Sequence, residues 1–528
     1  MFLVKKITSK WFKSFLAVSL TFSLFTAWAS DGRIASAEGP LDPAPIINPV
    51  GTANGKKVLF DNTHGQTAGA ADWVIDGAFS DFAQALAISG YYVKELRQST
   101  PITFENLQPY DVFVIPEANN PYKTSEQAAL LKYVQEGGSI FFISDHYNAD
   151  RNKNRWDSSE VFNGYRRGAW ENPAKGMSAE EAGSTVMQSV SSSDWLADNF
   201  GVRFRYNSIG NVTANVIVPK EQSFGITEGV QGVAMHAGST LAVTNPAIAK
   251  GIVYLPQTTD KWPHAVDDGI YNGGGVAEGP YVAISKVTKG KAAFIGDSSP
   301  VEDITPKYLR EENGQAKKTY DGFKEVDDAK LLVNVVNWLS HDEAYTNFTQ
   351  VPGLQLDQAT ALHSYEVPQQ STEPKPEPWA VPAAGYKWWD QSSFKPGSFG
   401  YTGSTNPGPG PGPGPVNPAY TLEYPASVKA GQPFSVCVKV SKAAPNTTLD
   451  LQLGIYVAGG QQIGQIQNAD GTWPTTYGYQ AVSLQTDGLG NGCKTITVRT
   501  EPSKTGAASI RLRSGKSNVV TNSITVTP

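Results

Sequence analysis

Residues 139–146 read SIFFISDH, a short apolar run that ends in polar side chains. An apolar run of this length without alternation is typical of a strand buried on both faces of a parallel sheet. The same texture recurs at DVFVIP, residues 111–116, and in shorter form at VLF, residues 58–60. Residues 80–89 and 124–134 carry apolar side chains at helical spacing. Strands that alternate with helices predict an α/β fold with a doubly wound, mostly parallel sheet.

The chain has 528 residues, which is too long for one ordinary domain. Hydrophobic residues make up 40% of it, enough to form packed cores. We predict five segments in chain order: a signal peptide (1–37), a Pro- and Gly-rich leader (38–55), the α/β domain (56–348), a Pro/Gly-rich linker (349–417) and an all-β sandwich (418–528).

The first 37 residues have the composition of a secretory signal peptide. Four lysines flank the start of an apolar run at 15–25, and the triplets AWA (27–29) and ASA (35–37) are both suitable cleavage sites. The apolar run is shorter than the roughly 20 residues that span a bilayer. We therefore expect a secreted, extracellular protein without a transmembrane segment after cleavage. The net charge of −6 argues against a surface coated in positive charge for nonspecific binding.

The C-terminal segment differs in texture from the rest of the chain. Residues 407–415 alternate Pro and Gly, which is typical of an extended linker. Short β-type runs between turns follow from residue 419, a pattern that favours a β-sandwich. The chain's two cysteines, Cys437 and Cys493, both lie in this part, and an oxidising compartment favours a disulfide between them. A thiol nucleophile in the α/β domain is excluded.

Polar side chains follow three of the predicted strands. The first strand end supplies Asp61 and His64, the second Asp145 and His146, and the third Asp297. Ligands bind beyond the carboxyl ends of parallel strands, so these groups would meet if the three strands are neighbours. We predict a site for a divalent metal ion (Mg, Mn, Zn or Ca) held by Asp61, His64, Asp145 and Asp297, with His146, Asp145 and His64 in catalytic roles. The alternative is that Asp and Asn end strands because they form turns and cap helices.

The segment after the second strand end interleaves basic and aromatic residues. Guanidinium groups match phosphate oxygens, and aromatic faces stack on bases, so this segment favours a phosphoester substrate beside the metal. The alternative is a solvated loop whose basic residues pair with Asp157 and Glu160. The predicted substrate-binding residues are Asn148, Arg151, Arg155, Trp156, Tyr165, Arg166 and Arg167.

Several motifs together resemble the class I glutamine amidotransferase-like superfamily, in particular the branch that includes the intraflagellar-transport-type domain. They are VLFDxxHG (58–65), the helix end Gly137-Gly138, the strand 140–143, GDSS (296–299) and NxxNWL (334–339). The resemblance spans about residues 56–345 and implies a flavodoxin-like sheet. Amidotransferases carry a cysteine after the strand that here ends at Ser144, whereas this chain has Asp145 and His146. The resemblance therefore does not imply glutaminase activity.

Two further resemblances concern partners. Residues 145–152 and 163–168 look like segments of secreted bacterial proteins labelled DNA-binding. The C-terminal segment is similar to Ig-like sandwiches appended to extracellular enzymes, which implies contact with a surface or a polysaccharide.

These observations predict a secreted metal-dependent hydrolase, a nuclease or phosphodiesterase acting on extracellular nucleic acid. Two alternatives stay open. One is a non-catalytic protein that binds DNA or the cell wall. The other is a carbohydrate-directed hydrolase in which paired carboxyl groups do acid–base work and some of the twelve tryptophans stack on sugars.

Overall fold

The computed structural model describes residues 38–528 except 266, 378–379, 403–417, 442, 444–446, 458, 487–490 and 515–516. The predicted signal peptide and the Pro-Gly alternation of the linker lie outside the described residues. Within the described part, none of the helices is both long and apolar enough to cross a membrane.

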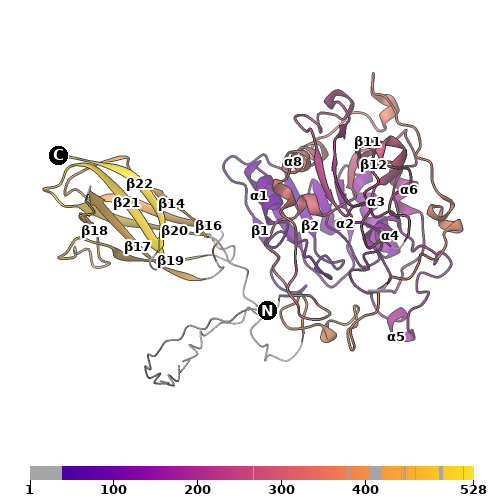
Figure 1. Cartoon of the computed structure of the whole chain (residues 1–528), viewed down its shortest axis with the longest axis horizontal. Helices are drawn as coiled ribbons and strands as arrows, with labels where there is room; N and C mark the ends of the chain where they lie inside the picture. Colours follow the sequence, from indigo (N-terminus) through magenta and orange to yellow (C-terminus); the bar gives the residue numbers. More distant parts are fainter. Residues whose placement is uncertain are drawn as a thin grey trace, which may run out of the picture. The chain divides into compact units, whose positions relative to one another are not determined.

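A nine-stranded sheet forms the centre of the α/β domain (Figure 1), with the strand order β1-β3-β2-β4-β5-β13-β12-β11-β8. Its strands are β1 (Ile46–Ile47), β2 (Lys57–Asp61), β3 (Tyr92–Leu96), β4 (Val112–Ile115), β5 (Ser139–Ile143), β8 (Val216–Ile217), β11 (Ala249–Tyr254), β12 (Pro280–Val287) and β13 (Gly290–Ile295). Two smaller sheets pair β6 (Val202–Phe204) with β10 (Leu241–Val243), and β7 (Asn211–Ala214) with β9 (Val233–His236).

The large sheet is mixed, which corrects the expectation of a mostly parallel sheet. The strands β3, β2, β4, β5 and β13 run parallel to one another. In contrast, β12 pairs antiparallel with β13 and β11, and β1 pairs antiparallel with β3. Every residue of β11 and β12 is buried, as in the parallel strands. Burial on both faces removes the alternation that would have marked these strands as antiparallel. The domain is therefore mixed α/β.

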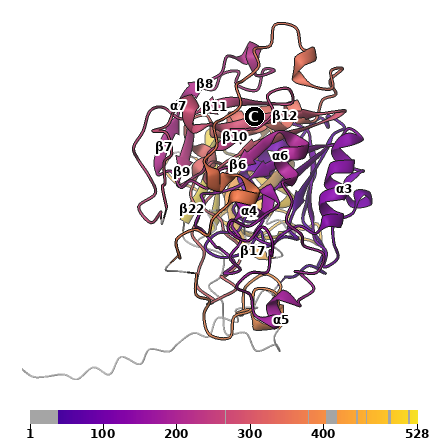
Figure 2. The same ribbon diagram turned by 90° about the vertical axis from the view of Figure 1, so that its right-hand side faces the viewer.

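Helices cover both faces of this sheet. Side chains alternate between the two faces of a strand, so Phe60 and Phe141 pack in one core with α1 and α8, whereas Leu59 and Phe142 pack in the other with α3 and α6. Figure 2 shows α3 alongside the indigo strands. The α-helices are α1 (Ser80–Ile88), α2 (Phe104–Leu107), α3 (Thr124–Gln135), α4 (Ser158–Asn163), α5 (Ala179–Ala182), α6 (Trp195–Phe200), α7 (Gly275–Glu278) and α8 (Asp328–Leu339).

Short 3-10 helices lie in the connections and toward the C-terminal end of the α/β domain. They are η1 (Lys220–Gln222), η2 (Ser299–Val301), η3 (Gly322–Lys324), η4 (Phe348–Gln350), η5 (Ser364–Glu366), η6 (Pro368–Gln370) and η7 (Gln391–Ser393).

Residues 349–377 and 380–402, part of the predicted linker, pack against the α/β domain, and we call them the strap. Glu366 of the strap accepts hydrogen bonds from Nε and Nη2 of Arg205, at 2.8 and 2.6 Å. The Tyr386 hydroxyl donates to Asn152 at 2.8 Å. A Pro-rich composition predicted an independent linker, but an extended segment can bind a surface through its side chains. The α/β domain therefore extends beyond residue 348, and the predicted leader likewise contributes β1 to the sheet.

The C-terminal part consists of two sheets that share one apolar core, which includes Val436, Val438, Ile510 and Leu512. The sheets have the orders β14-β16-β20-β18 and β15-β22-β21-β17-β19. Their strands are β14 (Ala419–Glu423), β15 (Ser427–Lys429), β16 (Phe434–Ser441), β17 (Thr448–Val457), β18 (Gly464–Ile466), β19 (Gln480–Gln485), β20 (Gly492–Thr500), β21 (Gly506–Ser514) and β22 (Ser517–Thr527).

The two cysteines lie on the paired strands β16 and β20. Their sulfur atoms are 2.7 Å apart and unbonded in this structure. A disulfide requires about 2.05 Å. The predicted disulfide therefore stays a prediction.

Candidate functional site

Four strand ends meet at one edge of the large sheet. Because β2, β4, β5 and β13 are consecutive, parallel neighbours, their carboxyl ends point the same way. The residues at or just after these ends include Asp61, Glu117, Asp145 and Asp297, all buried. The sequence predicted this convergence for three of the four strand ends. The loop after β4, which adds Glu117, was not among them.

Arg151 joins two of these carboxylates. Its Nε lies 3.3 Å from Oε1 of Glu117, and its Nη2 donates to Oδ2 of Asp145. Asp145 also accepts a hydrogen bond from the backbone N–H of His146 at 2.7 Å. The Arg151 side chain is 21% exposed, whereas those of Glu117 and Asp145 are buried. Arg151 is therefore the solvent-facing member of this group.

Two more buried acids come from the connection after β13. Asp297 accepts hydrogen bonds from the backbone N–H groups of His236 and Ser299, at 2.6 and 2.8 Å. Glu302 accepts from Trp73 Nε1 at 2.8 Å and from Ser298 Oγ at 2.9 Å. We call Glu117, Asp145, Asp297 and Glu302, with Arg151, the carboxylate cluster.

The carboxylate cluster holds four acidic groups and one guanidinium. Burial, followed by repulsion from Asp145, raises the pKa of Glu117 and of Asp297 well above their ordinary values. Burial also raises the pKa of Glu302. Oε2 of Glu117 is buried and has no hydrogen-bond partner among the described residues. The cluster therefore holds more acidic than basic groups, and the raised pKa values reflect this excess of buried negative charge.

His146 stands next to the cluster in its neutral form. Its Nδ1 lies 2.7 Å from the carbonyl oxygen of Tyr147, so Nδ1 carries the proton that this hydrogen bond requires. Burial lowers the pKa of His146, although Asp145 opposes the shift. The ring packs against Trp262 at 4.2 Å between centroids. Nε2 has no hydrogen-bond partner within the described part of the chain. It is therefore left as a proton acceptor.

Asp61 and His64 form a separate network. His64 lies between two carboxylates, with Nδ1 3.1 Å from Asp61 and Nε2 3.3 Å from Glu126. Burial alone would lower the pKa of His64, but Glu126 and Asp61 raise it to about 10. Asp61 also accepts hydrogen bonds from Thr63 and Gln66. Both ring nitrogens are engaged, so His64 offers no free nitrogen to a metal ion.

The expected metal ligands are thus divided between two networks. Asp145 and Asp297 belong to the carboxylate cluster, whereas Asp61 and His64 belong to the network with Glu126. Across the described ranges, no three His, Cys, Asp or Glu side chains are placed so that they would hold a metal ion.

The loop after β5 is held in an unusual backbone conformation. Asn148, Asp150, Lys153 and Arg155 all have positive φ angles, between 34 and 68°. Asp157 stabilises the loop because its carboxylate accepts hydrogen bonds from the backbone N–H groups of residues 148–150, at 2.6 to 2.9 Å. Positive φ is strained for such residues, and strain of this kind clusters at functional sites. The loop places Arg151 against Glu117 and Asp145.

The other predicted substrate-binding residues do not join Arg151. Arg155 pairs with Glu181 and Arg167 with Asp267, each at 2.8 Å. The aromatic residues Trp156 and Tyr165 are buried, at 1% and 0% exposure. Arg166 donates a hydrogen bond from Nη2 to the carbonyl oxygen of Lys175 at 2.5 Å, and Asn148 donates one from Nδ2 to Glu377 at 3.3 Å. Neither aromatic ring presents a free face to solvent. The acids that pair with Arg155 and Arg167 are also not the Asp157 and Glu160 of the solvated-loop alternative.

Two members of the cluster, Glu117 and Glu302, are not among the predicted site residues. Glu117 follows the apolar run of β4 after a single proline, which is the same strand-end signal that identified Asp145. Glu302 lies just after a 3-10 turn, seven residues beyond β13, too far from the strand end for that signal. Its contact with Trp73 joins segments 229 residues apart, which no local pattern reveals.

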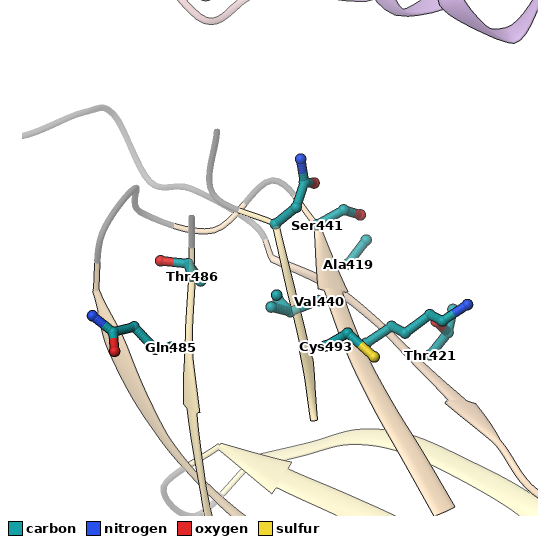
Figure 3. Close-up of a pocket in the computed structure, with 10 residues that line it drawn as sticks. Ala419, Thr421, Val440, Ser441, Gln485, Thr486 and Cys493 are labelled. Carbon is teal, nitrogen blue, oxygen red and sulfur yellow. The ribbon is translucent and has the colours of Figure 1, made fainter. Parts of the chain in front are cut away.

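The C-terminal part has an open hollow of about 640 Å³ at the edge formed by β14, β16, β19 and β20. Figure 3 shows Gln485 and Thr486 on one side and Thr421 on the other, with Val440 and Cys493 between them. Apart from Cys493, none of the predicted site residues lines it.

Comparisons with known proteins identify no family. No family model and no curated protein matches the chain. Among solved structures, the mmIFT52 N-terminal domain aligns with 55% of this chain and 99% of its own, at 13% identity and a TM-score of 0.34. The CARDB domain of the PF1109 protein from Pyrococcus furiosus, solved with di-metal ions, aligns with 21% of this chain and 88% of its own, at 14% identity and a TM-score of 0.14. The PorA N-terminal domain aligns with 20% of this chain and 87% of its own, at 12% identity and 0.13. TM-scores below 0.5 carry no argument about function.

Proposed function

We propose that this protein is a secreted hydrolase of extracellular nucleic acid, with its chemistry carried by the carboxylate cluster and His146. The observation that supports the proposal is charge: four buried acids gather at one edge of the sheet beside a single guanidinium, that of Arg151, which contacts two of them. Burying acids without compensation is costly for a fold, so such a cluster is a candidate for function rather than for stability.

A divalent cation is part of the proposal, with a changed ligand set. Its carboxylates would have to move together on binding, because no three such side chains stand at metal-binding positions among the described residues. Glu117, Asp145 and Asp297 offer only oxygen, which suits Mg²⁺, Mn²⁺ or Ca²⁺ better than Zn²⁺. The unpartnered Oε2 of Glu117 fits this role, whereas Asp61 and His64 do not. When bound, a divalent cation would offset the acidic charge and polarise a phosphoryl oxygen.

The chain's own residues have separate tasks in this proposal. Nε2 of His146 takes a proton from the attacking water, because the ring is neutral and Nδ1 is already bonded to Tyr147. The exposed edge of Arg151 orients an anionic oxygen of the substrate. A bound cation would replace the proton that burial favours on Glu117, and the leaving oxygen would then take its proton from water.

The test is cleavage of DNA and RNA by the purified secreted protein, with and without EDTA. We expect Asp145→Asn and Glu117→Gln, each of which removes a carboxylate that would hold the cation, to lower the rate by at least about 10-fold. The matched control is Asp328→Asn on α8, a buried carboxyl outside the cluster whose pKa burial raises to about 8. It should leave the rate unchanged.

Other outcomes would reject the proposal. Salt-sensitive binding of nucleic acid without cleavage would favour the non-catalytic DNA-binding alternative. Equal rates for the wild type and Asp145→Asn would place the chemistry elsewhere. Full activity in EDTA would show that hydrolysis needs no cation, which would reject that part of the proposal and keep the hydrolase.

A second candidate is a carbohydrate-directed hydrolase that needs no cation. It is favoured by carboxyl groups whose raised pKa keeps them protonated as general acids. The excess of acidic groups in the carboxylate cluster would also repel a polyanion, whereas it would not repel an uncharged substrate. Release of reducing sugar from a neutral glycan panel, abolished in Glu117→Gln, would favour this candidate over the nuclease.

The finer fold assignments are proposals as well. We interpret the α/β domain as a flavodoxin-like member of the class I glutamine amidotransferase-like superfamily, and the C-terminal part as Ig-like. Secretion rests on the sequence of residues 1–37, and the disulfide between Cys437 and Cys493 rests on the oxidising compartment that secretion implies.

A further inference from the structure

The outer face of the five-stranded sheet in the C-terminal part carries two arginines side by side. On β21, Ile510 and Leu512 point into the core and are fully buried. Arg511 and Arg513 alternate with them and therefore share the outer face. They lie two residues apart on one strand, about 6.6 Å along its axis. Arg511 faces Gly454 of the neighbouring strand β17, which has no side chain to cover it.

Both guanidinium groups are held in place by neighbouring side chains. Arg511 lies over the ring of Tyr456 at 4.4 Å, and its Nε donates to Thr521 at 2.9 Å. Arg513 lies over the ring of Tyr479 at 3.7 Å, and its Nε donates to Asn518 at 2.9 Å. Side chains that are already ordered lose less entropy when they bind a ligand.

Neither arginine has an acidic partner. Among the residues that the structure describes, no carboxylate forms an ion pair with Arg511 or Arg513. Arg155 and Arg167 in the α/β domain, in contrast, are paired with Glu181 and Asp267. Residues 418–528 also contain nine Lys or Arg against five Asp or Glu, although the whole chain has a net charge of −6.

We propose that this face binds the phosphate backbone of a nucleic-acid strand through Arg511 and Arg513. The planar guanidinium forks match phosphate oxygens, and their spacing along an extended strand suits consecutive anionic groups on a linear polymer. The two tyrosine rings are already stacked on the arginines, so binding depends on backbone charge and not on base identity. The choice of nucleic acid as the polymer rests on the proposed function. Tethering this face to the α/β domain would raise the effective concentration of substrate there.

The experiment measures binding separately from cleavage. The full secreted protein is titrated with a fluorescent single-stranded oligonucleotide in EDTA, over a series of salt concentrations. We expect Arg511→Gln combined with Arg513→Gln to weaken binding at least about 10-fold. The slope of log K against log salt should fall by about 1.4, because each phosphate that is no longer neutralised reduces it by about 0.7.

Arg499→Gln is the matched control. Arg499 also lies over an aromatic ring, Trp473 at 4.3 Å, but it belongs to β20 of the other sheet. It should leave the affinity unchanged, and unchanged melting of all variants excludes misfolding as the cause of weaker binding.

Three outcomes would overturn the inference: unchanged binding by the double variant, an equal weakening in Arg499→Gln, or arginine-dependent binding of a sulfated glycan without binding of the oligonucleotide. Failure of the proposed function gives a different result. In that case the oligonucleotide binds through Arg511 and Arg513 but is not cleaved, and Asp145→Asn changes nothing.

Discussion

At the scale of single residues, similar sequence signals led to two different environments. Asp61 is the last residue of the strand β2 and Asp145 follows the strand β5, and each has a histidine close after it. His64 lies between Asp61 and Glu126 and is charged, whereas His146 is bonded to a carbonyl oxygen and neutral. Their pKa values therefore move in opposite directions. The partner of the imidazole decides which histidine can act as a base.

The network of His64 makes stability depend on pH. The pKa of His64 is raised to about 10, so its contribution is complete below its ordinary pKa of 6.5 and is lost as pH rises toward 10. Glu126 shows the opposite dependence. Burial alone would raise the pKa of Glu126, but the neighbouring His64 lowers it to about 2. The contribution of Glu126 to stability is therefore complete above pH 4.5 and is lost as pH falls toward 2. We expect His64→Gln to lower the melting temperature most near pH 6 and much less near pH 10.

The control for this prediction is His236→Gln. His236 also contacts a carboxylate, Glu325 at 2.7 Å, but that carboxylate is 43% exposed and screened by water. Its effect on the melting temperature should be small. A constant difference between the wild type and His64→Gln from pH 6 to pH 10 would show that the charge of His64 does not stabilise the fold.

At the scale of elements, the loops beyond the sheet edge decide how the site is assembled. The loop after β2 approaches the loop after β5 at Gly69, whose φ is +73°. A Cβ atom at this position would lie 2.9 Å from the carbonyl oxygen of Arg151 and 3.2 Å from its Cβ. Glycine is therefore required there both by the backbone conformation and by the space available.

Gly69→Ala tests this contact between loops. The left-handed conformation alone costs about 1 kcal/mol for alanine, and the clash with Arg151 adds to it. We expect a lower melting temperature and a loss of whatever activity depends on Arg151. The measurement is thermal unfolding together with the cleavage assay.

Gly225→Ala separates the two contributions. Gly225 has a similar φ of +81°, but a Cβ atom there would have no neighbour within 4 Å. We therefore expect Gly225→Ala to lower the melting temperature, because of the backbone conformation alone, and to leave the activity unchanged. Equal effects of the two substitutions would mean that the close approach to Arg151 is unimportant.

At the scale of the whole molecule, the strap changes the boundary of the α/β domain. Its Glu366 forms a two-bond ion pair with Arg205, which directly follows β6, and both residues are almost fully buried. Lys250 pairs with Asp357 of the strap at 2.9 Å. A buried ion pair that loses one partner costs about 3–5 kcal/mol, because the remaining charge stays buried.

Truncation tests the boundary. A chain that ends at residue 348 leaves Arg205 and Lys250 without these partners, so we expect it to be insoluble or to melt several degrees lower. A chain that ends at residue 402 keeps the strap and should retain the melting transition of the α/β domain in the full protein. Identical melting temperatures of the two truncated chains would show that the strap does not stabilise the α/β domain and is only a linker. Glu366→Gln in the full chain checks the ion pair alone.

Local patterns were enough for the elements that depend on neighbours in sequence. The apolar runs of β4 and β5 and the helical spacing of α1 and α3 appear in the structure where they were predicted. Asp145 and Asp297 were found by the same means, because a strand end is a local feature. Glu117 could have been found with this signal, whereas Glu302 could not, since only its contact with Trp73 brings it to the site.

The sequence by itself determined the α/β class of the large domain, the β-rich C-terminal part and the strand ends where polar groups gather. Tertiary structure alone decided the antiparallel half of the sheet, the strap, and the division of the two Asp-His pairs between a charged network and a carboxylate cluster. The physical reason is that periodicity reports burial, whereas strand direction and the protonation of a buried group depend on residues that are distant in the chain.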